Sequence, residues 1–182
     1  MNFTNWLLLL FPVVFIIHSI TELFLLKPWL RRNALLISEC GSVFTKGTLS
    51  IFKKLSTKCI AFIALEEFLI ISLVTTYGLI SGNYYPWIAL LCGFFFHLII
   101  HIANWMSYMR YIPSIITTFL SAAFCIYTLD YSIHVLNLSP LKISISGFTG
   151  IIIYSLNLYL VIGLSLFIRF TKLKGTNPKA IG

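Results

Sequence analysis

The chain has 182 residues, of which 59% are hydrophobic and only 10% are charged, and its formal net charge is +8. Soluble domains average about 25% charged residues, so this composition leaves too little polar surface to cover a water-soluble fold. It excludes a soluble enzyme. A nucleic-acid-binding protein would need a folded basic face with aromatics, and the sequence has none. One integral membrane domain accounts for the length.

Five apolar segments are each long enough to cross a bilayer as a helix, which takes about 20 residues. They are continuous rather than alternating in short runs, which favours helices over a barrel. The sequence therefore predicts an all-α, integral membrane bundle of five transmembrane helices. The expected spans are 6–26, 59–81, 86–109, 113–135 and 143–170. The first has no preceding basic residue and no small-residue cleavage site, so we expect it to be a retained span rather than a signal peptide.

We expect residues 1–170 to form a single transmembrane domain and residues 171–182 a basic cytoplasmic tail. Segment 27–58 holds seven of the 13 Lys and Arg residues with apolar anchors between them, which is typical of an interfacial segment on an anionic leaflet. Twelve of the 13 basic residues fall on one side of the predicted bundle, and only Lys142 falls on the other. The positive-inside rule then predicts an outer N-terminus, a cytoplasmic C-terminus and a multi-pass protein of the cell membrane.

Ionisable side chains inside hydrocarbon are costly, so those within the spans are candidate site residues. Asp130, His134 and Arg169 lie near span ends and are expected to be interfacial. The candidates are His18 and Glu22 in the first span, Glu66 and Glu67 in the second, and His97 and His101 in the third. Residues four apart share one face of a helix, so each of the two histidine-containing pairs projects in one direction. The adjacent glutamates point about 100° apart, so we expect only one of them to face the centre fully.

These groups are expected to lie at one depth. With the boundaries above, His18, His101 and the two glutamates lie seven or eight residues from the inner ends of their spans, which is roughly 12 Å below the inner boundary. The sequence thus predicts one intramembrane His/Glu site that opens toward the cytoplasmic side. Four further residues are expected to support it: Asn104, Arg110, Thr117 and Thr118. Asn104 extends the histidine stripe, and Arg110 is expected to anchor the third span or to bind an anionic head group.

Several of these residues, in order, resemble the HXXEE family of small bacterial membrane proteins. The family has a histidine in the first span followed by acids at the third and fourth positions; this chain has His18, then Thr21 and Glu22. The later histidine of the family precedes an Arg-aromatic-x-Pro-Gly turn and threonines, which resembles His101 and 110–117, with Ser114 in place of the usual Gly. Family members often carry Asn four residues before the later histidine, and this chain has His97 at that position. The resemblance covers roughly residues 8–130 and implies a shared site without naming a reaction.

The donor set favours a metal site. Imidazole and carboxylate are ordinary ligands of zinc, iron and manganese, and helical bundles that point Glu and His inward recur in metal centres. The expected ligands are His18, Glu22, Glu66 or Glu67, His97 and His101. The ion would activate water or oxygen in a hydrolase or oxidoreductase that acts on a lipid or another apolar substrate from the bilayer. In that enzyme His18, Glu22 and His101 are the expected catalytic residues.

Two other functions stay open. A metal-free isomerase would use His and Glu as general acid and base, with Trp105 and Tyr108 as candidate aromatic lining. A non-enzymatic transport, immunity or partner-binding protein would use the same groups as a structural hydrogen-bonded network. The protein partners are not specified by the sequence. In the last span, Asn157 is expected to form a helix–helix hydrogen bond.

Overall fold

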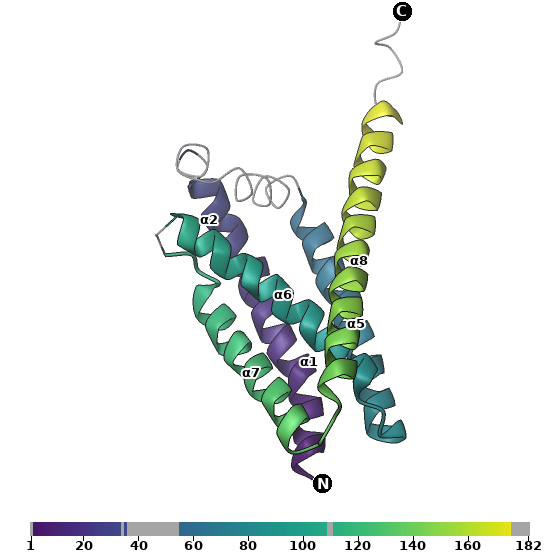
Figure 1. Ribbon diagram of the computed structural model, residues 1–182. Helices are drawn as coiled ribbons and strands as arrows, with labels where there is room; N and C mark the ends of the chain where they lie inside the picture. Colours follow the sequence, from purple (N-terminus) through teal and green to yellow (C-terminus); the bar gives the residue numbers. More distant parts are fainter. Residues whose placement is uncertain (1, 34, 36–54, 109–110, 176–182) are drawn as a thin grey trace, which may run out of the picture.

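The computed structural model describes residues 2–33, 35, 55–108 and 111–175, and these residues form helices joined by short turns, with no strand among them. Five helical rods are long and apolar enough to cross a membrane (Figure 1). They are α1 (Phe3–Thr21), which continues through η1 (Glu22–Leu26) into α2 (Lys27–Arg32), then α5 (Thr57–Ser81), α6 (Tyr85–Tyr108), α7 (Ile115–His134) and α8 (Pro140–Gly175). The predicted all-α, five-span fold is confirmed.

Two helices extend beyond the predicted spans. The first rod continues to Arg32 rather than ending near residue 26, and α8 runs to Gly175 rather than ending near residue 170. Helices end where the backbone loses its hydrogen-bonding pattern, which need not coincide with the end of the apolar run. The predicted interfacial segment therefore begins as helix, while its central part, 36–54, lies outside the described residues. The orientation of the termini stays a prediction.

One stripe of α1 packs against α6 and carries the site. Leu8, Phe11, Phe15 and His18 recur at three- and four-residue intervals and are all buried. This spacing places them on one face of the helix, and Glu22 is the next member of the series. The rings of Phe11 and Phe15 lie 5.8 and 5.5 Å from the ring of Phe94 on α6. The same core contact that joins α1 to α6 thus directs His18 toward α6.

Helices α8 and α1 differ in how closely they approach α6. Small residues bring α8 into close contact, because a Cβ atom added to Gly150 would overlap the backbone carbonyl of Ala89. The backbones of α1 and α6 stay farther apart, and bulky rings meet between them. The wider spacing on the α1 side of α6 leaves room for the polar side chains that meet there.

A wider helical turn begins at Glu22. Residues Glu22–Leu26 form a π-helical segment, and Pro28 follows it in α2. Proline has no N–H, and its ring clashes with the carbonyl four residues earlier, here that of Phe24. A widened turn relieves this clash, and π-helical segments occur frequently at functional sites. The π-helical segment therefore begins at Glu22, a residue of the first rod that points into the bundle.

Candidate functional site: a buried His/Glu cluster

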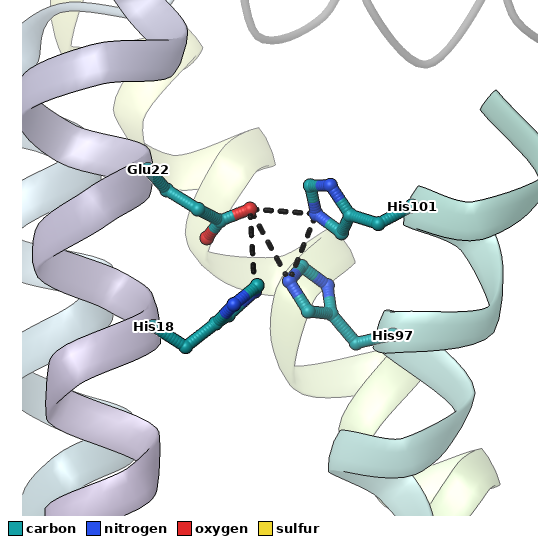
Figure 2. Close-up of side chains that lie close together, drawn as sticks. All are labelled: His18, Glu22, His97 and His101. Atoms are coloured by element: carbon teal, nitrogen blue, oxygen red, sulfur yellow. Dashed lines mark hydrogen bonds and ion pairs between the residues drawn. The ribbon is translucent and has the colours of Figure 1, made fainter. Parts of the chain in front are cut away.

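Three histidines converge on one oxygen of Glu22 (Figure 2). Glu22 Oε1 lies 2.6 Å from His101 Nε2, 3.4 Å from His97 Nε2 and 3.8 Å from His18 Nε2. The first rod supplies Glu22 and His18, and α6 supplies the other two imidazoles across the gap. The donor atoms of the four residues all lie within 4.8 Å of one another.

The cluster is buried and its hydrogen bonding is incomplete. His18 is 1% exposed, and neither of its ring nitrogens has a hydrogen-bond partner among the described residues. His97 and His101 share one hydrogen bond between their Nε2 atoms, 3.1 Å apart. Despite the close approach of His101, Glu22 Oε1 has no described partner with hydrogen-bond geometry. A buried polar atom left without a partner costs about 1–3 kcal/mol, so this arrangement favours a bound ligand.

The distances fit a metal ion. Four ligands placed tetrahedrally at about 2.0–2.1 Å from one ion lie about 3.3 Å from one another. The Glu22–His97 and His97–His101 atom pairs lie 3.4 and 3.1 Å apart, close to that separation, whereas Glu22–His101 is shorter at 2.6 Å and Glu22–His18 longer at 3.8 Å. A cation would give the His18 and Glu22 donor atoms a partner, and it would neutralise a carboxylate that is costly to bury in its charged form. The residues present therefore fit a metal centre.

The two glutamates of α5 have separate surroundings. Asn157 on α8 donates a hydrogen bond from Nδ2 to Glu66 Oε2 at 2.9 Å, so the predicted helix–helix bond of Asn157 is present. Glu67 is 8% exposed and lines a cavity of about 40 Å³ together with His18, Glu22 and His97. Neither glutamate belongs to the group of four converging ligands. Glu67 is the one that faces the site.

The expected supporting residues take different places. Asn104 is buried on α6, one turn beyond His101. The hydroxyls of Thr117 and Thr118 donate to the backbone carbonyl of Ser114, at 3.0 and 2.8 Å, and so stabilise the start of α7 instead of pointing a free donor into the cluster. The prediction for Arg110 lies outside the described residues. Thr21, at the position of the first family acid, donates to the carbonyl of Ile17 on its own helix.

Sequence reasoning missed Tyr154 of α8. Its ring lies 5.9 Å from that of His97, and it borders the same cavity as Glu67 and the histidines. A tyrosine in an apolar helix full of other aromatics gives no signal by itself. The signal lies in Gly93 of α6, because the close approach of α8 at that glycine brings Tyr154 onto α6.

Trp105, one of the two aromatic residues proposed for a metal-free isomerase, does not line this cavity. Trp105 packs instead against Leu26, Leu30 and Ile112, and its ring meets that of Phe119 edge-on. The side chain of Tyr108 lies outside the described residues. The rings that do border the cavity are those of Phe15, Phe94 and Tyr154.

The donor atoms of this largely buried cluster could hold a cation or exchange protons between imidazole and carboxylate. No curated protein and no solved structure matches the chain. The profile of a protein family described as "Protein of unknown function with HXXEE motif" matches residues 9–128, which include all four converging residues. This match extends over more than half of the chain, and the protein therefore belongs to the HXXEE family.

Proposed function

We propose that the protein is a membrane-embedded metalloenzyme that acts on a lipid or another apolar molecule. One metal ion is held by His18, Glu22, His97 and His101, and the observation that carries the proposal is the convergence of their donor atoms within 4.8 Å. A cluster held together by hydrogen bonds alone would be expected to pair its buried atoms. Here both ring nitrogens of His18 lack a partner among the described residues.

The number of ligands bears on the choice of metal. Zinc sites are almost always four-coordinate, so four protein ligands would fill the coordination sphere and leave no position for substrate. Manganese takes six oxygen or nitrogen ligands, and non-haem iron sites with His and carboxylate ligands keep open positions for chemistry. An enzymatic role therefore favours iron or manganese. Zinc would favour a structural role instead.

The cavity supports the enzymatic role. It lies against His18, Glu22 and His97, and its volume of about 40 Å³ exceeds the 10–15 Å³ that one water molecule requires. The remaining lining is largely apolar, including Leu55, Ile60 and Ile63. A site with polar donors on one wall and apolar side chains on the others suits a substrate that comes from the bilayer.

Elemental analysis of detergent-purified protein tests the proposal. We expect near-stoichiometric iron or manganese in the wild type and its loss in His101→Ala and Glu22→Ala variants that remain folded. Glu66→Gln is the matched control, because it alters a carboxylate of the same region that contacts Asn157 rather than the cluster. Wild-type protein that stays metal-free after incubation with iron, manganese and zinc would refute the metal site. A proton-exchanging or structural network would then be the remaining function.

A further inference from the structure

A second hollow adjoins the cluster cavity on the side away from α1. It has a volume of about 120 Å³ and lies between α5, α6 and α8. Glu67, Phe94 and Tyr154 border both hollows, so these three residues form the boundary between them. On the far side the lining is apolar except for Asn157. Ile70 and Ile153, which also line it, are 37% and 53% exposed, so the hollow opens between α5 and α8 toward the lipid.

The apolar hollow continues along the bundle. A further hollow between the same helices shares Leu90 and Ile153 with it and reaches Asn83 and Tyr85 at the end of α5 and the start of α6. From Glu67 to Ser81, the last residue of α5, the helix rises about 21 Å at 1.5 Å per residue. One leaflet of a bilayer has a hydrocarbon thickness of about 15 Å. Together the two apolar hollows form one crease between α5, α6 and α8. This crease is long enough for a complete alkyl chain.

The carboxyl group of Glu67 lies at the inner end of this crease. Glu67 is 8% exposed, and its Oε1 atom is buried without a hydrogen-bond partner among the described residues. The Tyr154 phenol borders the same point from α8 and interacts with the Glu67 carboxyl group, so Oε1 is the carboxyl oxygen that remains available. A buried acceptor without a partner, at the closed end of an apolar crease, matches an amphiphile whose head group donates a hydrogen bond.

The surroundings select among head groups. The hollow has no Lys, Arg or His in its described lining, so an anionic head would have no counter-charge there and would meet Glu67. An ammonium head would pair with the carboxylate, but burying it in hydrocarbon is costly. A hydroxyl can donate to Glu67 Oε1 beside the Tyr154 phenol at a much smaller desolvation cost.

We infer that Glu67 and Tyr154 form the head-group site for a long-chain alcohol whose alkyl chain lies in the crease between α5, α6 and α8. The binding of the alcohol does not depend on the proposed function. Only its role as the substrate that would reach the metal rests on that function. Glu67 is then a binding group rather than a metal ligand, and the alcohol lies between the lipid opening and the His/Glu cluster.

Photolabelling tests the inference. The probe is a long-chain alcohol with a diazirine beside the hydroxyl, and the labelled residues are mapped by mass spectrometry. We expect labelling at Glu67, Tyr154 and their neighbours, with competition by the unlabelled alcohol and at least about tenfold weaker competition by the matched fatty acid, alkylamine or alkane. Labelling spread evenly over lipid-facing residues, or equal competition by the other three molecules, would overturn it.

Three variants and one control sharpen this test. Ile153→Trp places a large ring where the two apolar hollows meet, and we expect about tenfold weaker labelling. Ile152→Trp is the control, because Ile152 is exposed on the same helix and lines neither hollow. Glu67→Leu and Tyr154→Phe should abolish the preference for alcohol over alkane. Should Glu67→Leu fail to fold, the other two variants still decide, and unchanged labelling and preference in them would contradict the inference.

Metal content measured on the same samples separates this inference from the proposed function. If wild-type protein lacks metal yet is labelled as described, the alcohol site stands and the metalloenzyme proposal fails. If Glu67→Leu loses both metal and labelling while His18 and His101 variants keep their metal, then Glu67 is a ligand and the inference is wrong.

Discussion

His18 is the residue of the cluster whose two ring nitrogens both lack a hydrogen-bond partner among the described residues. Its ring is almost fully buried. Leu8, Phe11 and Phe15 on the same stripe hold α1 against its neighbours, so the ring cannot turn to water without disturbing the core. A metal ion would give Nε2 its missing partner.

Thr21 is expected to play no part in metal binding, although it occupies the position of the first family acid. Its hydroxyl donates to the carbonyl of Ile17 at 2.9 Å and so belongs to its own helix. Thr21→Val, which keeps the shape and removes the hydroxyl, should leave the metal-to-protein ratio unchanged and shift stability by less than about 0.5 kcal/mol. His18→Ala, three positions earlier, should lose the metal in the same elemental analysis. Metal loss in Thr21→Val would show that the hydroxyl reaches the ion.

Asn157 is expected to be structural. Hydrogen bonds between transmembrane helices average about 0.6 kcal/mol and reach about 1.7, so Asn157→Leu should destabilise the fold by an amount in that range. Thermal or denaturant unfolding in detergent would measure the loss, and metal content should not change. Asn157→Leu in a Glu66→Leu background should cost less than in the wild type, because the bond is already absent. Equal costs in both backgrounds would contradict this assignment.

Much of the cluster follows from residue spacing alone. His18/Glu22 and His97/His101 are each four residues apart, and a helix carries such pairs on one face whatever its neighbours are. The partners of Glu66 and Glu67 depend instead on how α8 is rotated against α5, which spacing within one helix does not encode. The same is true of Tyr154. The hydroxyls of Thr117 and Thr118 donate hydrogen bonds to a backbone carbonyl at the start of α7, as hydroxyls in apolar helices commonly do.

At the scale of elements, the site depends on an unequal packing of α6. Glycines bring α8 close on one side, and phenylalanine and histidine rings hold α1 away on the other. Composition and hydropathy predict that the chain has membrane spans, and the five continuous apolar runs predict their number. They do not predict which spans touch, so the partner of α8 and the crease beside it are visible only in the three-dimensional structure.

Gly150 should be much less tolerant of a side chain than Gly163 on the same helix. A Cβ atom at Gly150 would overlap the carbonyl of Ala89, whereas at Gly163 it would meet nothing within 4 Å. Gly150→Ala should therefore cost about 1–3 kcal/mol, as other overpacking changes do. Gly163→Ala should be neutral or stabilising, since alanine favours helix over glycine by roughly 1 kcal/mol. Unfolding of both variants in detergent checks this pair, and equal stabilities would show that α8 does not pack on α6 as described.

At the scale of the whole molecule, an odd number of membrane-spanning helices would place the two ends of the chain on opposite sides of the membrane. The start of α1 and the end of α8 lie at opposite ends of the bundle (Figure 1). Which end is cytoplasmic follows only from the distribution of basic residues, and that distribution predicts an outer N-terminus.

Cysteine labelling of intact cells tests this orientation. In a background without the four native cysteines, Asn83→Cys in the α5–α6 turn should react with a membrane-impermeant maleimide from outside. Ser56→Cys, just before α5, should react only after the cells are permeabilised. The reverse pattern would invert the topology and place the opening of the cluster on the outer side.

The central claim is that three imidazoles and one carboxylate hold a single metal ion inside the bundle. X-ray absorption at the metal edge of the purified protein tests it most directly. The account predicts a first shell of nitrogen and oxygen only, at about 2.0–2.2 Å, with the outer-shell scattering of about three imidazoles and no sulfur. A sulfur neighbour at about 2.3 Å, or a spectrum unchanged in the His101→Ala variant, would place the metal elsewhere and contradict the account.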